Sequence, residues 1–459
     1  MFLQADEQGG NASTFRPRRE ENGNFFPEYY VIPIDGEFQR NRAAAADIVE
    51  YLLRNDVAVK SLTQDVSLEA NEYRDSLSFK AGSIVVDMHQ AKRNMAHVAL
   101  YSNLTIDDWT GLYSEPVTNF PDFHDFDAVS VNTPGAFAED MLVDVDASPK
   151  VASSVSGEGS AAIIANTTVQ AILAVNALLD AGTPVGLILE GEYAGDYVVS
   201  SDSLADVADR FVIEVTKTDA VPPAKIIKSG VKVYVPGALP EYSSDETGRE
   251  YGVKNYRNLL NNSLAWDRFA LEKQMGFALA ASADEADIIV GNGALSEDEA
   301  AKVAQGKPYV GYGSVAVSSI RDAGLEVDCS LDDGDKPTKS GDFDALANVK
   351  FESDSIVTVA YAKRGDSLFY GHGGAMMTKA PDAAARLLSI TNDPFVEGFM
   401  TADHVEKYKG SLQAIDCTFE GWNAVLFANS LTNKAYQLHE YRYLAAAIYS
   451  RILEGDFAL

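Results

Sequence analysis

The segment FKAGSIVVDMHQAKRNMAHVAL, which runs from Phe79 to Leu100, begins as an apolar strand and continues as a basic, helix-like stretch. Its central pattern, AGSIVV at residues 81–86, returns as AGDYVV at residues 194–199. A glycine before a buried strand is typical of a tight turn or a bulge. The recurrence predicts that this strand belongs to an internal repeat.

The elements around the two glycines support the repeat, because they follow the same order in both places. Residues 28–35 predict a strand, and residues 41–56 a helix with apolar residues on one face. In the second copy, residues 160–167 predict the strand and residues 168–182 the helix, which ends at a glycine. Each copy therefore predicts a strand–helix–strand–turn–strand unit.

A third region, from residue 230 onward, alternates strands and helices. Residues 263–279 predict one helix, Ser296 and Glu299 form a capping-box pattern at the start of another, and residues 307–314 predict the next strand. Such alternation predicts a mostly parallel sheet with helices on both faces. Polar, hairpin-like sequence at 326–370, a β-rich piece at 411–430 and a helix at 433–453 follow.

The predicted fold class is therefore α/β, with several doubly wound, mostly parallel units and β-hairpin insertions in the last. The predicted divisions are a linker or peripheral strand at 1–26, repeat units at 27–150 and 151–225, and an α/β domain with β insertions at 226–459.

The composition and net charge limit the classes of partner that we expect for this chain. The 459 residues are 46% hydrophobic and 23% charged, which is ordinary for a soluble globular protein. A formal net charge of -31 repels nucleic-acid phosphates and anionic lipid, so we expect neither as a partner. No apolar run reaches about 18 residues, so no membrane span is predicted. The first ten residues, MFLQADEQGG, carry no export-signal pattern.

Two cysteines, Cys329 and Cys417, are present without a CxxC motif. This excludes a disulfide-rich scaffold and a cysteine zinc knuckle. The pair could form one disulfide or remain as two buried thiols.

His89, Lys92 and Arg93 are the first candidate ligand contacts. His89 and His97 are eight residues apart, which is roughly 12 Å of rise along a helix, so they cannot bind one metal ion together. His89, Lys92 and Arg93 could hold a carboxylate or a phosphate. The alternative is a polar surface at the end of a strand.

A second group of candidates lies in glycine-rich turns. Residues 311–316, GYGSVA, fit G-x-G-x-x-A, a weak dinucleotide pattern that stands late in the chain. Tyr312 occupies the position between glycines where a hydrolase carries Ser or Cys. FYGHGGAMM, at 369–377, could line a phosphate or carboxylate pocket or form a tight loop. The candidate contacts from these turns are Gly311, Gly313, Ser314 and His372.

No catalytic, cofactor-binding or metal-ligating set is predicted. HExxH and HxxE motifs are absent from the sequence. Clustered carboxylates at Asp332, Asp333 and Asp335 lack the EF-hand spacing, so a solvated hairpin tip is expected, with opportunistic calcium as the alternative.

The region from about residue 20 to residue 135 resembles the segment downstream of the catalytic domain in large bacterial zinc carboxypeptidases of the carboxypeptidase A-like family. The features that carry this resemblance are Ile32-Pro33, Leu52 to Val57, Gly82 to Val86, and Gln90, Lys92 and Arg93. Residues 160–450 are more diffusely similar to the class I glutamine amidotransferase-like domain that follows in some of these peptidases, including the stretch around Arg442.

The resemblance implies a non-catalytic C-terminal region of such a peptidase. Zinc would then sit in the parent's catalytic domain and not in this chain, because no HxxE motif or general-base glutamate has a matching position here. The implied partners are the upstream peptidase domain and peptide or cell-wall substrate. The implied location of the parent is extracellular or in the cell envelope.

Three hypotheses follow. The first is an accessory module of a zinc metallocarboxypeptidase, inactive alone. The second is a module that binds a small ligand or cell-wall material at the carboxyl ends of its parallel strands. The third is an independent amidotransferase-like hydrolase, which would need a nucleophile and a base.

Overall fold

The computed structural model divides the chain into two compact units. Met1–Ala152 with Glu397–Phe399 form the first unit, and Ser153–Val396 with Met400–Leu459 form the second. The predicted segments 151–225 and 226–459 thus fall almost entirely within one unit. The structure describes residues 21–35, 38–102, 119–237, 242–244, 247, 250–253, 264–330, 344–372, 374–400 and 402–459.

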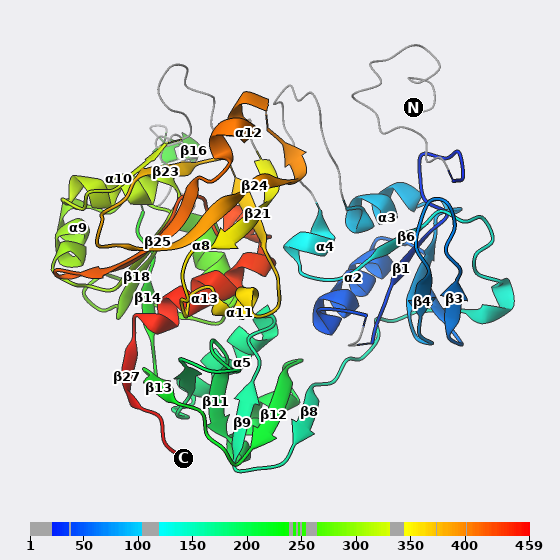
Figure 1. Cartoon of the computed structure of the whole chain (residues 1–459), viewed down its shortest axis with the longest axis horizontal. Coiled ribbons are helices and arrows are strands. Elements are labelled where there is room, and N and C mark those ends of the chain that lie inside the picture. Colours follow the sequence, from blue (N-terminus) through cyan, green and yellow to red (C-terminus); the bar gives the residue numbers. More distant parts are fainter. Residues whose placement is uncertain are drawn as a thin grey trace. The chain divides into compact units, whose positions relative to one another are not determined.

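The first unit contains a five-stranded sheet in the order β6-β1-β5-β2-β7, of which β1 and β6 are labelled side by side in Figure 1. Both β1 and β2 pair antiparallel with β5, so β1 and β2 run in the same direction with one strand inserted between them. The helix α2 connects them, as in a split β-α-β unit. The strands are β1 Tyr29–Ile32, β2 Lys60–Leu62, β5 Ile84–Asp87, β6 Val129–Val131 and β7 Leu142–Asp144, with a separate hairpin of β3 Val66–Leu68 and β4 Leu77–Phe79.

The helix α2 forms where its sequence predicts. The side chain of Asn41 accepts a hydrogen bond from the N–H of Ala44, which caps the first turn. Ile48, Val49 and Leu52 are buried against the sheet. The helices of this unit are α2 Arg42–Arg54, α3 Arg93–Leu100, α4 Phe120–Phe123 and the 3₁₀ turn η2 Glu139–Met141.

The second unit repeats this strand order. Its seven-stranded sheet contains the series β12-β9-β11-β10-β13, which corresponds strand for strand to β6-β1-β5-β2-β7. Every neighbouring pair in both series is antiparallel. The strands are β8 Ser154–Gly157, β9 Ala161–Ile164, β10 Gly186–Ile188, β11 Tyr197–Ser200, β12 Glu214–Thr218, β13 Ala224–Ile227 and β27 Leu453–Asp456.

The glycines of the repeated pattern occupy the same conformation. Gly82 has φ 92° and Gly195 has φ 83°, and each precedes the strand inserted between the other two. This left-handed region costs little only for glycine. The helices beside this sheet are α5 Val169–Asp180, α6 Ala205–Ala208 and the 3₁₀ turn η3 Ser201–Leu204.

The parallel strands lie in an eleven-stranded sheet, where β17-β14-β18-β19-β26 pair in parallel. Along β18, Ile288 and Val290 face one apolar core and Ile289 faces another, so both faces are covered. The α/β fold class is therefore confirmed, but the prediction of mostly parallel sheets in the two repeat units is wrong, because their corresponding strands pair antiparallel. The parallel strands are β14 Lys232–Tyr234, β17 Ala278–Leu279, β18 Ile288–Gly291, β19 Tyr309–Tyr312 and β26 Trp422–Phe427.

Antiparallel strands extend this sheet as the β-rich sequence predicts. Hairpin partners β25 and β26 pair from Ala414–Phe427 to Phe419–Trp422. The remaining strands are β20 Asp328–Ser330, β21 Asp344–Phe351, β22 Leu368–His372, β23 Met376–Lys379, β24 Ala385–Phe399 and β25 Leu412–Phe419, with a separate hairpin of β15 Tyr242–Ser244 and β16 Glu250–Val253.

Two helices of this unit are shorter than their sequence predicts. The helix expected at 263–279 ends where Gly276 adopts φ 80°, and the one expected at 433–453 begins late because Lys434 and Ala435 adopt positive φ. The helices are α8 Leu264–Phe269, the π-helix η4 Ala270–Gln274, α9 Glu297–Ala304, α10 Ser314–Asp322, α11 Val359–Ala362, α12 Ala402–Tyr408, α13 Tyr441–Ser450, and the 3₁₀ turns η5 Asn433–Ala435 and η6 Leu438–Glu440.

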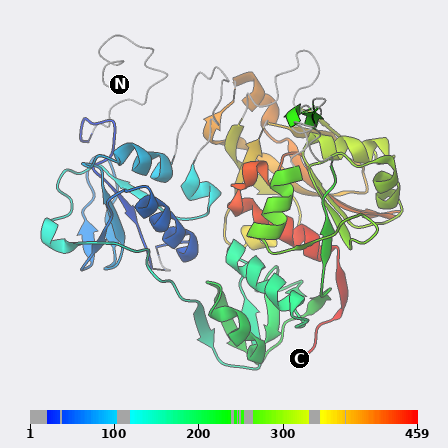
Figure 2. The same ribbon diagram turned by 180° about the vertical axis from the view of Figure 1, so that it is seen from behind.

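The helix α13 joins the two sheets of the second unit. It contacts α5 on one side and β19 on the other, and views from the front and from behind show it between the sheets (Figures 1 and 2). Ser296 and Glu299 form the predicted capping box at α9. No helix in the described part of the chain is long and apolar enough to cross a membrane.

Candidate functional site

The basic residues of the opening segment do not converge on one ligand position. His89 is exposed and lies 3.0 Å from the carboxylate of Asp87 and 3.3 Å from that of Glu28. The Nζ of Lys92 is 3.9 Å from Asp56. His89 and Lys92 therefore each have their own partner within the first unit.

Arg93 and His97 contact aromatic rings. The guanidinium of Arg93 lies 5.0 Å from the ring centroid of Phe26. His97 is buried, and its Nδ1 is 2.8 Å from the hydroxyl of Tyr30. His97 is therefore a packed interior residue, whereas Arg93 is exposed and lies over one aromatic ring.

The glycines of the GYGS turn have steric roles. A Cβ on Gly311 would lie 2.5 Å from the ring of Tyr309. Gly313 has φ 83°, and a Cβ there would lie 2.2 Å from Oδ1 of Asn292. Ser314 is the first residue of α10. The turn therefore needs its glycines for close packing.

A group of polar residues lies at the carboxyl ends of β18 and β19. We call it the strand-end cluster, and its members are Tyr312, Asp267, Asn292 and Thr432. The hydroxyls of Tyr312 and Thr432 donate to Oδ1 of Asp267, over 2.9 and 2.5 Å. The backbone N–H of Asn292 donates to Oδ2 of Asp267 over 2.9 Å. Both carboxylate oxygens of Asp267 thus have donors, and Asp267 is fully buried.

Tyr312 is fully buried, and burial raises the pKa of its phenol well above the ordinary value. It lies within β19, and its backbone does not adopt a positive φ. A nucleophile elbow exposes its side chain on a strained turn. Tyr312 is instead buried, and it lies in a regular strand.

The two cysteines remain free thiols in the interior. Cys329 lies on β20 and Cys417 on β25. Burial raises the pKa of each thiol to about 12. A thiolate is the nucleophilic form of cysteine, so neither residue is activated.

Two other predictions concern residues that are only partly described. His372 ends β22, where its backbone pairs with Asp344, but its side chain lies outside the described part of the structure. Asp332, Asp333 and Asp335 also lie outside the described residues.

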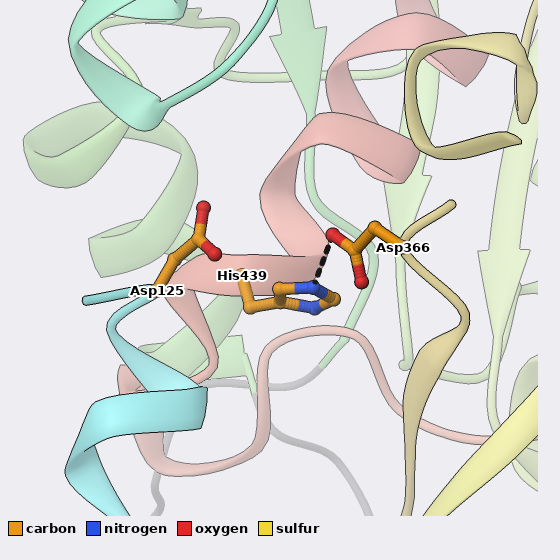
Figure 3. A group of neighbouring side chains, drawn as sticks. All are labelled: Asp125, Asp366 and His439. Atoms are coloured by element: carbon orange, nitrogen blue, oxygen red, sulfur yellow. Dashed lines mark hydrogen bonds and ion pairs between the residues drawn. The ribbon is translucent and has the colours of Figure 1, made fainter. Parts of the chain in front are cut away.

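A second polar group, which we call the His439 cluster, consists of Tyr361, Asp366, His439 and Arg442. The Nε2 of His439 is 2.9 Å from Oδ2 of Asp366 (Figure 3). Arg442 donates to the same oxygen over 2.8 Å. The guanidinium of Arg442 also lies 4.0 Å from the ring centroid of Tyr361.

Charge keeps Asp366 ionised. Burial favours its neutral form, but the charges and hydrogen bonds of His439 and Arg442 outweigh burial and hold its pKa well below the usual range. A carboxylate on one ring nitrogen orients an imidazole and leaves the other nitrogen to act. No described residue forms a hydrogen bond with Nδ1 of His439.

No pattern in the sequence predicted the His439 cluster. His439 and Arg442 are three residues apart, a spacing that places two side chains on one helical face. Asp366 is 73 residues from His439, and nothing in the sequence pairs them.

Asp125, also drawn in Figure 3, belongs to the first unit. There its Oδ1 lies 3.6 Å from the guanidinium of Arg40, which also contacts Asp122 at 2.8 Å and Asp127 at 3.5 Å. Asp125 has φ 64°, a backbone conformation that residues other than glycine rarely adopt.

No family model and no curated protein matches this chain. Solved structures do match, and three are similar over about half of the chain. They are the exo-β-1,4-mannosidase Op5Man5 from Opitutaceae bacterium strain TAV5 (12% identity, 49% of this chain and 36% of that one, TM-score 0.27), the cytoplasmic protein STM1381 from Salmonella typhimurium LT2 (11%, 49% and 100%, 0.29) and a ThuA-like protein from Parabacteroides merdae ATCC 43184 (11%, 48% and 89%, 0.28).

The chain thus spans 36% of the mannosidase's length. With TM-scores of 0.27 to 0.29, these similarities carry no argument about function.

Proposed function

We propose that this chain is a non-catalytic accessory region of a zinc metallocarboxypeptidase of the carboxypeptidase A-like family. The parent would hydrolyse peptides outside the cell or in the cell envelope, with zinc in its own catalytic domain. The chain's partners would be that upstream domain and peptide or cell-wall substrate. The support for the link to this family is the resemblance of the segment around residues 20–135.

The observation that carries the non-catalytic role is the strand-end cluster. An amidotransferase-like hydrolase needs a reactive side chain at the turn after the central strand. Tyr312, the last residue of β19, stands just before that turn, and its hydroxyl donates to the buried carboxylate of Asp267. The carboxylate in turn receives two further donors, so the hydroxyls of Tyr312 and Thr432 are both engaged with Asp267.

A hydrolase that uses a cysteine of this chain is disfavoured. Both thiols are buried and their pKa values are raised to about 12. At neutral pH, a thiol with such a pKa is almost entirely protonated.

A second candidate is a module that binds a small ligand, and the His439 cluster favours it. His439 and Arg442 hold the same carboxylate oxygen, and Nδ1 of His439 forms no hydrogen bond with a described residue. This arrangement could donate to, or accept from, a polar ligand without any reaction.

The coding sequence on the 5′ side of the Met1 codon tests the first proposal. An in-frame peptidase domain with an HxxE motif is the expected result. A separate, unrelated gene with its own promoter ahead of Met1 would overturn the link to carboxypeptidases.

Activity of the purified chain tests the non-catalytic role. We expect no release of the C-terminal residue from short peptides, with or without added zinc, and less than one tightly bound zinc per chain. Peptide or ester hydrolysis that Cys329→Ala or Cys417→Ala abolishes would instead establish the hydrolase.

Titration of short peptides with a free carboxylate tests the second candidate. Binding should be weakened by His439→Ala and unchanged by His89→Ala, which alters an exposed histidine held by Asp87 and Glu28. Equal binding by wild type and His439→Ala would remove the cluster from consideration.

A further inference from the structure

The N-terminus of α5 in the second unit is not capped by any described side chain. Thr168 is the N-cap residue, but its side chain accepts no hydrogen bond from the helix. The N–H of Ala171 bonds to the carbonyl of Thr168, and no described residue accepts from the N–H of Val169 or Gln170. Two donors at the positive end of a 12-residue helix are therefore open.

Asn166, two residues before the N-cap, is a second and independent observation that points to a ligand at this position. Its side chain is fully buried, and neither its amide nitrogen nor its amide oxygen has a hydrogen-bond partner among the described residues. Buried side-chain amides in folded proteins are nearly always hydrogen-bonded. This amide is therefore placed to meet a group that no described residue supplies.

The direction of the Asn166 side chain follows from the sheet. The ladder continues beyond β9, because the N–H of Ala165 donates to the carbonyl of Glu214. Ala162 and Ile164 pack in the core that α5 covers. Side chains alternate between faces along a strand, so Asn166 lies on the same side, under the start of α5.

Positive charge lies beside this position. Arg364 donates from Nη1 to the backbone carbonyl of Asn166 over 3.2 Å. The nearby carboxylate of Asp196 accepts from the N–H of Asn166 and is paired with Lys363 at 2.6 Å and with Arg364 at 3.9 Å, so two positive charges lie against one carboxylate. A small negative group at the helix start would thus meet the helix dipole and a guanidinium, although the chain as a whole carries a formal charge of -31.

We propose that the N-terminus of α5, together with the buried amide of Asn166 and the hydroxyl of Thr168, is a binding site for a small oxyanion, a carboxylate or a phosphate. The N–H groups of Val169 and Gln170 and the amide NH₂ of Asn166 donate to its oxygens. The site stands whether or not the chain serves a peptidase.

Calorimetric titration of the full chain with inorganic phosphate and with acetate, each against sodium chloride at equal ionic strength, tests the site. At least one of the two should bind beyond the chloride control, and the one that binds tells whether phosphate or carboxylate is preferred. Loss of a hydrogen bond to a charged group predicts that Asn166→Ala weakens this binding about tenfold or more. Thr168→Val should weaken it in the same direction.

Asn176→Ala is the matched control. Asn176 is a buried asparagine of the same helix, but its amide is satisfied, because it donates to the carbonyl of Met275 and accepts from the hydroxyl of Tyr449. This variant should bind the anion as wild type does, even if it is less stable. Weakening that is equal in Asn176→Ala and Asn166→Ala would show a general loss of structure and overturn the site.

A buried water molecule would satisfy the same amide without any anion. That alternative predicts that neither phosphate nor acetate binds beyond the chloride control. Such a result, or binding unchanged in both Asn166→Ala and Thr168→Val, would overturn the proposal.

Discussion

At the scale of single residues, two tyrosines of β19 differ in one respect. Tyr309 and Tyr312 are both fully buried. The hydroxyl of Tyr312 donates to Asp267, whereas no described residue bonds the hydroxyl of Tyr309. The two positions therefore separate the effect of burial from the effect of a hydrogen bond to a buried carboxylate.

Tyr312→Phe should lower the free energy of unfolding by about 1–3 kcal/mol, since it leaves the buried carboxylate of Asp267 short of one donor. Tyr309→Phe should be neutral or stabilising, because it removes a buried hydroxyl that has no partner. Urea denaturation of both variants measures the difference. Equal losses would show that the Tyr312 hydrogen bond contributes nothing beyond packing.

Glu440 is a second informative residue, because burial raises its pKa to about 8 although the N–H of Tyr370 and the side chain of Gln437 donate to it. The folded chain therefore holds this proton more tightly than the unfolded chain. Its contribution to stability is full below the unfolded pKa, near 4.5, and is lost as pH rises through about 8.

We expect the free energy of unfolding to fall by an amount on the order of several kcal/mol between about pH 5 and pH 8 because of this group. Glu440→Gln should flatten that slope. Denaturant titrations at several pH values measure it, with Glu297→Gln, at an exposed position of α9, as the control. An unchanged slope in Glu440→Gln would contradict the assignment.

At the scale of elements, the turn before the inserted strand carries the repeat. Gly82 and Gly195 both adopt positive φ. Their surroundings differ, because a Cβ on Gly82 meets no atom within 4 Å, whereas one on Gly195 lies 2.7 Å from Cγ1 of Val359.

Gly82→Ala should therefore cost about 1 kcal/mol of stability, through backbone strain alone. Gly195→Ala should cost more, because strain and a steric clash combine. Gly455→Ala is the control, since Gly455 has no positive φ and no atom within 4 Å of a Cβ. Thermal unfolding of the three variants gives the order, and a Gly195→Ala protein as stable as Gly82→Ala would show that Val359 moves freely.

At the scale of the whole molecule, the last strand, β27, forms one edge of the seven-stranded sheet of the second unit. β27 pairs with β13, although their paired residues Lys225 and Asp456 are far apart in the sequence. Phe457 packs in the core on one face of that sheet, and its ring lies 2.8 Å from a Cβ built on Gly186. The end of the chain therefore stabilises residues near the start of this unit.

Phe457→Ala should destabilise the second unit by about 3 kcal/mol and leave the first unit unchanged. Hydrogen exchange followed by mass spectrometry distinguishes the units, with faster exchange expected in β10 and β13 but not in β1 or β5. Leu459→Ala, at an exposed position, is the control. Faster exchange in both units would contradict the expectation that the loss of stability is confined to the second unit.

The sequence by itself determined the elements and their repetition. The apolar spacing of α2, the capping box of α9 and the glycines of the AG-[SD] turns act through neighbours along the chain, so they can be read without knowledge of the fold. Tertiary structure decided which strands are neighbours: β5 inserts between β1 and β2, and the repeat is antiparallel where alternation alone predicts parallel strands.

Tertiary structure also decided the candidate sites. The Asp366–His439 pair and the Asp267–Thr432 pair join residues 73 and 165 positions apart, and no local pattern encodes such contacts. The basic residues after Gly82 attract attention in the sequence, but in the structure each has a partner close by. The start of α5 drew no attention in the sequence, because the residues that lie near it, and that no described side chain caps it, are known only from the fold.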